Sequence, residues 1–250
     1  METVNLIKAT LSDIKDKNFK LAVLPWGATE PHNLHLPYLT DCLLAQSIAL
    51  DAAEKLYNET GINCMVLPPV PFGAQNPGQR ENTFCIHTRY STQFAILSDI
   101  VSSLYYQGIR RLAIINGHGG NTFKPLIRDL ANDFPDFIIS VTDWFAIVPQ
   151  EEYFENKDDH AGEMETSVLL HYHPNLVDMK KAGKGSYHPF KMKSLNEKIA
   201  WVPRHWNKAS DDTGIGNPSK STPEKGEKYA KEVVKRISDL FYDMAVSELY

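Results

Sequence analysis

The feature that most constrains the fold of this chain is an alternation of short apolar segments with longer amphipathic ones. Apolar segments of strand length lie at residues 20–26, 64–70, 111–116 and 137–142. Helical spacing of apolar residues occurs at about 40–56, 91–108, 123–132 and 164–172, and again from Thr222 to Met244. Strands that alternate with helices in this way are typical of βαβ units. The sequence therefore predicts an α/β fold with a largely parallel, helix-covered sheet.

Length, charge and cysteine content argue against several other classes of protein. The 250 residues carry a net charge of −5 and no extended basic tract, which argues against a nucleic-acid-binding protein. The apolar runs are too short to cross a bilayer, and the N-terminal segment lacks the basic-then-apolar layout of a signal peptide. Three cysteines without a CxxC pair indicate neither a disulfide framework nor a zinc ribbon. We therefore expect one globular, cytoplasmic domain over residues 1–250, without a nucleic-acid or membrane partner.

Residues 180–222 interrupt the regular pattern. They are rich in Lys, Gly, Ser and Pro and show little periodicity. Such a composition is typical of loops, so we expect this segment to pack on the domain rather than to form a second core. It is expected to shape either the pocket or a contact between subunits.

The first candidate site loop follows the first predicted strand and spans residues 27–37. Glu30 and His32 are two residues apart, so their side chains project to the same side of an extended segment. Asp41 begins the next predicted helix, and the loop can fold it back toward them. Two carboxylates and an imidazole are plausible ligands for Zn²⁺, Mn²⁺ or Fe²⁺. The alternative is that these are ordinary loop residues and that Asp41 is only a helix cap.

The second candidate loop is Asn116-Gly117-His118-Gly119-Gly120-Asn121, after the third predicted strand. A dinucleotide-binding G-x-G-x-x-G pattern that starts at Gly117 fails because Thr122 occupies its third glycine position. No lysine completes a phosphate-binding P-loop either, so a nicotinamide- or nucleotide-binding function is not supported. The glycines permit a tight turn that presents His118 at a strand end, although His118 could also be incidental there.

The third candidate segment spans residues 158–167. If a helix begins near Ala161, then His160 and Glu163 lie one turn apart on one face, while Glu165 points elsewhere. The acidic residues could instead serve only to cap the helix. Nucleophilic catalysis has less support, because the chain has no G-x-S-x-G elbow and no recognisable cysteine signature.

Four segments together resemble the creatininase family of metal-dependent amidohydrolases. They are Glu30–Asp41, Asn116–Asn121, His160–Ser167, and Gly214–Pro218 continuing to Thr222–Gly226, in the order in which the family has them. The resemblance implies a three-layer α/β/α sandwich, assembly as a homohexamer, and two divalent metal ions (Zn, Mn or Fe) per chain. It also implies a small-molecule amide as substrate.

The resemblance also assigns roles to residues. Glu30 and His118 would bind one ion, His32 would bind the other, and Asp41 would bridge both. Water activated by the ions would attack an amide carbonyl. His160 matches the family's proton-handling histidine and would protonate the departing nitrogen.

Two departures from the family pattern affect these expectations. Creatinine-hydrolysing members carry a glutamate ligand where this chain has Gly120, and we expect Glu163 to supply the missing carboxylate, with Glu165 in a supporting role. Trp144, Gly119 and Asp159 are expected to contact the substrate. Gly119 replaces a family tyrosine, and a polar residue near Asn156 replaces a second tryptophan, so a clamped flat ring is poorly supported.

The sequence therefore predicts a metal-dependent amidohydrolase that cleaves a C–N bond in a cyclic or linear amide. The glycine loop is more similar to that of relatives that open a formamide or trim a peptide, so those activities are the first alternatives. A non-catalytic metal-binding scaffold is the second alternative. His160 argues against the scaffold, because a protein that only binds metal needs no proton carrier.

Overall fold

The computed structural model describes residues 4–157 and 159–250, and four parallel strands form its central sheet. The strands are β1 (Leu21–Trp26), β2 (Cys64–Val66), β3 (Arg111–Asn116) and β4 (Ile138–Asp143), in the order β2-β1-β3-β4. Trp26 lies level with Asn116, and Asn116 with Asp143, so three strands end at the same edge of the sheet. Strand β2 is shorter than the predicted 64–70 because prolines follow it, which cannot donate to the ladder.

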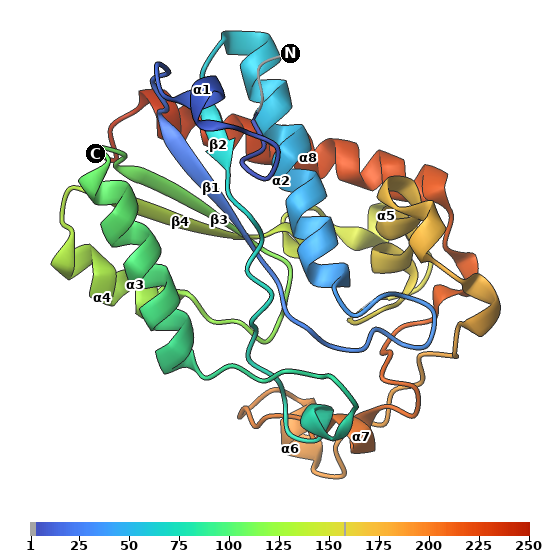
Figure 1. The fold of residues 1–250 in the computed structure, drawn as a ribbon. Coiled ribbons are helices and arrows are strands. Elements are labelled where there is room, and N and C mark those ends of the chain that lie inside the picture. The colour runs from blue at the N-terminus through green and yellow to red at the C-terminus, as the bar shows by residue number, and fades with distance from the viewer. Residues whose placement is uncertain (1–3, 158) are drawn as a thin grey trace.

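Helices cover both faces of the sheet, as Figure 1 shows. Helices α2 (Thr40–Thr60), α5 (Glu163–Tyr172) and α8 (Pro223–Val246) pack on one face, and α3 (Tyr90–Tyr106) and α4 (Lys124–Asp133) pack on the other. Alternate residues of β1 join the two cores: Leu21 and Val23 face the first, whereas Ala22 and Leu24 face the second. The predicted three-layer α/β/α sandwich with a parallel sheet is confirmed.

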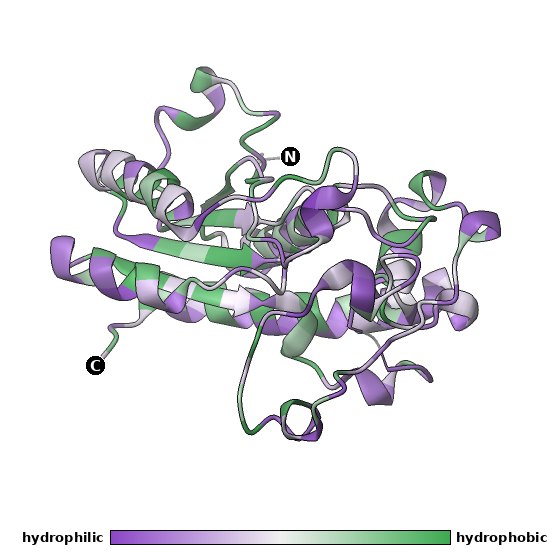
Figure 2. Ribbon diagram, turned by 90° about the horizontal axis from the view of Figure 1, so that it is seen from below, coloured by the Kyte–Doolittle hydropathy of each residue, from purple (hydrophilic) through white to green (hydrophobic). Residues whose placement is uncertain are grey.

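Helix α8 illustrates how the sequence builds these layers. The Thr222 side chain accepts a hydrogen bond from the backbone N–H of Lys225 and so caps the helix start. Apolar and polar residues alternate along the helix (Figure 2), and Tyr229, Val233 and Phe241 on one stripe are buried. This stripe places α8 against both α2 and α5.

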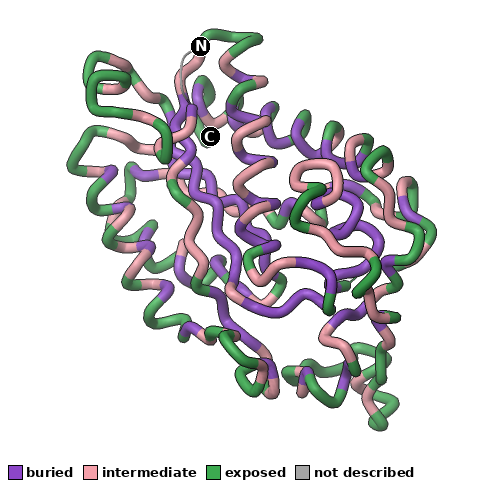
Figure 3. Tube along the Cα trace, turned by 45° about the vertical axis from the view of Figure 1, so that its right-hand side comes forward, coloured by how far each residue is buried: buried purple, intermediate pink, exposed green. Residues whose placement is uncertain are grey.

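The remaining elements are short. Three more α-helices are α1 (Leu11–Ile14), α6 (Lys193–Asn196) and α7 (Trp206–Ala209). The 3₁₀ turns are Gln79–Glu81, Trp144–Ala146, Gln150–Glu152, Pro174–Leu176, Met179–Lys181 and Pro218–Lys220. The part of the molecule around α6 and α7 is largely exposed in Figure 3, which agrees with the loop predicted at 180–222. Within the described residues, no helix has the length and apolar character needed to cross a membrane.

The strand order creates a crevice between β1 and β3. Helix α2 leads from β1 to β2 on one face, whereas α3 leads from β2 to β3 on the other. The loops that follow β1 and β3 therefore diverge at the strand ends, where ligands bind in open α/β sheets. Two glycines let the start of α2 approach this point: a Cβ on Gly27 would lie 2.6 Å from the Cβ of Asp41, and one on Gly117 would lie 2.4 Å from its carbonyl oxygen.

Candidate metal centre

Six acidic and histidine side chains meet in the crevice, and all six are buried. We call them the carboxylate–histidine cluster: Glu30, His32, Asp41, His118, His160 and Glu165. The loop after β1, the start of α2, the loop after β3 and the segment leading into α5 each contribute at least one of them. The structure thus brings together the three loops that the sequence pointed to.

Asp41 stands at the centre of the cluster. It belongs to two groups whose ligand atoms lie within 4.8 Å of one another, one with Glu30 and His118 and the other with His32 and Glu165. His118 Nδ1 lies 2.9 Å from Glu30 Oε1 and 3.2 Å from Asp41 Oδ2. On the other side, His32 Nε2 lies 2.8 Å from Asp41 Oδ1. One carboxylate therefore reaches both groups through different oxygens.

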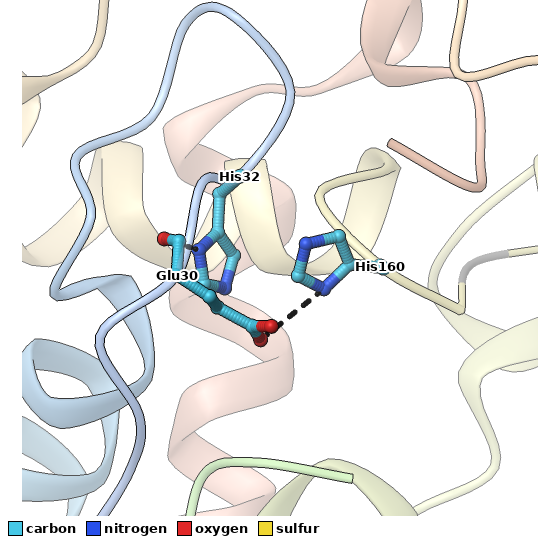
Figure 4. A group of neighbouring side chains, drawn as sticks. All are labelled: Glu30, His32 and His160. Carbon is cyan, nitrogen blue, oxygen red and sulfur yellow. Dashed lines mark hydrogen bonds and ion pairs between the residues drawn. The ribbon is translucent and has the colours of Figure 1, made fainter. Parts of the chain in front are cut away.

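His160 faces the same cluster from the segment before α5. Its Nδ1 lies 3.8 Å from Glu30 Oε1, and its ring centroid lies 4.3 Å from that of His32 (Figure 4). Glu30, His32 and His160 form a third group in which ligand atoms lie within 4.8 Å of one another. His160 could therefore hold a metal or exchange protons with something bound beside Glu30.

Three backbone carbonyls orient the three histidine rings. His32 Nδ1 lies 3.1 Å from the Glu30 carbonyl oxygen, and His160 Nε2 lies 3.0 Å from that of Pro31. His118 Nε2 lies 2.8 Å from the carbonyl oxygen of Ala74. Because a carbonyl only accepts, each of these nitrogens carries a proton, and the other nitrogen of each ring faces the cluster. Metal-binding histidines are oriented in the same way.

Like the histidines, the carboxylates of the cluster are suited to binding a metal ion. Glu30 Oε1 and Asp41 Oδ2 are buried, and both lie against the same nitrogen, His118 Nδ1, at 2.9 and 3.2 Å, which has at most one proton to donate. Such atoms are costly inside a protein unless a cation or a donor satisfies them. The second oxygen of Glu30 accepts a hydrogen bond from the side-chain amide of Gln79, which holds the carboxylate in place. This set of imidazole and carboxylate donors suits Zn²⁺, Mn²⁺ or Fe²⁺.

The charged groups of the cluster shift the pKa values of its histidines. Burial alone would lower the pKa of His32, but the Asp41 carboxylate outweighs it and raises that pKa to about 10. Burial likewise opposes charge on His118, yet Glu30 holds the pKa of this imidazole well above its usual range. For His160, burial and then the nearby His32 lower the pKa instead. Protonated His32 and His118 thus balance the carboxylates where metal ions would otherwise do so, and metal binding must release their protons.

The choice of Glu163 as the fifth ligand is corrected by the geometry. Glu163 points away from the cluster: its Oε1 lies 2.6 Å from Lys225 Nζ, and its Oε2 accepts from the backbone and side chain of Asn156. Glu165 instead belongs to a candidate ligand group with His32 and Asp41, and the backbone N–H of Ala161 donates to its carboxylate.

A turn before the helix explains the error. Ala161 adopts a left-handed backbone conformation (φ 53°), and α5 begins only at Glu163. His160 is therefore outside the helix and pairs with Ile215 in an isolated antiparallel bridge. The assumption of one continuous helix from Ala161 put the wrong glutamate on the face of His160.

The expected substrate residues divide into two kinds. Gly119 and Asp159 line both cavities at the cluster, one of about 470 Å³ and a smaller one of about 130 Å³. Trp144 lines neither, because its side chain is fully buried in the core beside Phe145 and Tyr229. A substrate contact for Trp144 is therefore wrong.

Other aromatic residues lie at the larger cavity, and the sequence reasoning missed them. Trp201, Arg204 and Trp206 line it from the 180–222 segment, and the ring of Trp206 meets that of His160 edge-on at 5.3 Å between centroids. Two tryptophans five residues apart in a polar, non-periodic stretch were the available signal. The segment thus shapes the pocket, one of the two roles expected for it.

A family model described as creatininase, creatinine amidohydrolase, matches residues 8–241. Among curated proteins, the chain is 29% identical to a mycofactocin precursor peptide peptidase of Mycolicibacterium smegmatis, over 88% of this chain and 83% of that protein. It is 30% identical to a creatinine amidohydrolase of Pseudomonas putida, over 64% of this chain and 66% of that protein. Relatives in this family therefore include both a peptidase and a cyclic-amide hydrolase by name.

Solved structures agree with the fold. A crystal structure of a Bacteroides fragilis protein, provisionally named creatinine amidohydrolase, has 58% identity and a TM-score of 0.99, covering 100% of this chain and 99% of that one. A creatininase structure with 22% identity has a TM-score of 0.80 and covers 99% of this chain and 100% of that one. Related creatininase structures are described as Zn–Zn and Mn forms, at 22% and 21% identity.

Proposed function

The chain belongs to the creatininase family, and from this premise we propose that it is a two-metal hydrolase of C–N amide bonds. Membership supports a hydrolase that acts on amides, because the family model spans residues 8–241 of the 250. The further claim of two ions per chain rests on the carboxylate–histidine cluster. Its main support is that Asp41 belongs to two ligand groups at once.

Each group has ligands suited to one ion. Glu30 and His118 would hold the first ion, His32 and Glu165 would hold the second, and Asp41 would contact both through its two oxygens. Divalent ions bound there would activate a water molecule and polarise the amide carbonyl. The carbonyls of Glu30 and Ala74 keep the imidazoles of His32 and His118 turned inward, so the site needs little reorganisation on loading.

His160 is the residue placed to move a proton. Its Nε2–H is held by the Pro31 carbonyl, which leaves Nδ1 facing Glu30 Oε1 at 3.8 Å, and the residue lines the large cavity. Since burial lowers its pKa, the ring is neutral near pH 7 and can accept a proton at Nδ1. It can then donate this proton to the departing nitrogen, which leaves poorly without one.

The cavities favour a linear amide over a small ring. The larger and smaller cavities share Glu30, His118 and His160, so the reacting bond would lie where they meet. A substrate can therefore extend in two directions from this bond, as a peptide or an acylated amino acid does. The glycine loop supplies no aromatic ring to clamp a planar substrate at Gly119 or Gly120. The similarity to peptidases over 88% of the chain agrees with this preference.

Assembly as a homohexamer and a cytoplasmic location remain predictions from the family resemblance. A formamide hydrolase and a cyclic-amide hydrolase remain the alternative activities. A metal-binding scaffold without turnover is the alternative of another class.

The test of the proposed function is turnover that depends on metal. Protein loaded with Zn²⁺ or Mn²⁺ is incubated with N-acetylated dipeptides, N-formyl amino acids and creatinine, and the released amines are quantified. We expect at least one class to be hydrolysed with kcat of about 1–10³ per second. A chelator should abolish this turnover, and added Zn²⁺ or Mn²⁺ should restore it. Bound metal without hydrolysis of any class would contradict the proposal and favour the scaffold.

A further inference from the structure

A further hollow adjoins the larger of the two cavities at the cluster. This outer groove, of about 760 Å³, is lined by Lys157, Tyr187, Lys198 and Trp201 among others. Asp159, Trp201, Val202 and Arg204 line both the groove and the large cavity, so the two spaces adjoin at these residues. Leu195 and Asn196 of α6 also line the groove, and Figure 1 shows where this helix lies in the fold.

Arg204 stands where the groove meets the cavity. Its guanidinium donates to the carboxylate of Asp159, the residue next to His160. The same guanidinium carbon lies 4.9 Å from the ring centroid of Trp206 and 6.0 Å from that of Tyr187. Trp206 also contacts His160, so a single side chain separates Arg204 from the proton-carrying imidazole.

The guanidinium of Arg204 can bind a ligand in addition to Asp159. A guanidinium has five N–H donors in a planar fork, and among the described residues the only hydrogen-bond partner of Arg204 is Asp159. Its side chain keeps 29% of its surface exposed. Stacking against aromatic rings restricts the fork, so less freedom is lost when it binds a carboxylate.

The groove is basic in an acidic protein. The chain carries a net charge of −5, yet among the described residues that line the groove Lys157, Lys198 and Arg204 are basic and only Asp159 is acidic. A local excess of positive charge attracts anions and leaves neutral compounds unaffected.

We propose that Arg204 recognises a carboxylate on the substrate, so that the substrate class is an amide carrying an anionic group on the groove side of the scissile bond. A peptide with a free C-terminus or an N-acyl amino acid has this chemistry. This inference rests on the proposed function, since it places the anion relative to the bond that the cluster would cleave. Arg204 acts in binding and specificity, while the cluster and His160 act on the bond itself.

The experiment compares two probes that differ only in the anion. N-acetyl-alanyl-alanine has a free carboxylate, and its C-terminal amide lacks it. Binding is followed by the fluorescence of the tryptophans at the site, and kcat and KM are measured with Zn²⁺-loaded protein. The variants are Arg204→Met, which keeps an apolar stem, and Arg110→Met as the matched control. Arg110 also pairs with an aspartate and stacks on a tyrosine, at the opposite end of the sheet.

We expect wild type and R110M to favour the carboxylate probe over the amide by about 10- to 100-fold, through KM. R204M should lose this preference, because its KM for the carboxylate probe rises by about 10- to 100-fold more than its KM for the amide probe. Equal losses on both probes, or a preference that survives in R204M because the ions bind the carboxylate, would overturn the inference. If wild type binds the carboxylate probe but hydrolyses neither, the proposed function fails and the loss of binding in R204M still supports the subsite.

Discussion

Replacing His160 with glutamine is expected to lower kcat by about 10²- to 10⁴-fold while the bound metal stays in place. Glutamine can still donate to the Pro31 carbonyl, as His160 Nε2 does, so the loop before α5 should keep its shape. The substitution removes Nδ1, the ring nitrogen that faces Glu30. The measurement is kcat on the best amide of the panel, together with metal analysis of the same preparation.

His171→Gln serves as the matched control, because His171 lies later on α5 and outside the cluster. Its kcat and metal content should equal those of the wild type. Loss of a metal ion in H160Q would contradict a proton-carrying role. In that case His160 would be a ligand, as its group with Glu30 and His32 allows.

The two glutamates at the start of α5 are expected to differ in their effect on metal binding. Glu165→Gln is expected to reduce the metal content from about two ions per chain to about one, because a neutral amide is a much poorer ligand than a carboxylate. Amide hydrolysis should fall with it. Metal analysis after removal of loosely bound ions measures the first effect, and a turnover assay measures the second.

Glu163→Gln is the matched control, two residues away on the same helix. Its carboxylate binds Lys225 and Asn156 rather than the cluster, so the metal content should not change. Thermal stability should drop instead, because Lys225 loses its buried partner. Metal loss in E163Q with full metal in E165Q would contradict the assignment made from the structure.

These two glutamates show where the sequence reasoning reaches its limit. The strands at 111–116 and 137–142, the cap at Thr222 and the buried stripe of α8 follow from local patterns and agree with the structure to within a residue or two. Apolar periodicity fixes such elements because it depends only on spacing along the chain. The direction of Glu163 and Glu165 depends instead on the left-handed Ala161, which no spacing rule reveals.

Likewise, some residues of the site could be predicted from the sequence and others could not. Glu30, His32 and His118 lie in loops that follow parallel strands, and Asp41 lies in the first turn of α2, which follows the first of these loops. Topology alone brings such segments together. The substrate contact of Trp144 was expected only from the family resemblance, and its ring is buried in the core instead. Arg204 and Trp206 come from an irregular segment whose path over the cavity has no counterpart in periodicity or spacing.

The most direct test of the account is the metal content of the wild-type protein, purified without chelator and measured by elemental analysis. Two ligand groups that share Asp41 predict about two divalent ions per chain, of Zn, Mn or Fe. A protein that contains no metal and stays empty after incubation with Zn²⁺ and Mn²⁺ would contradict the two-metal hydrolase.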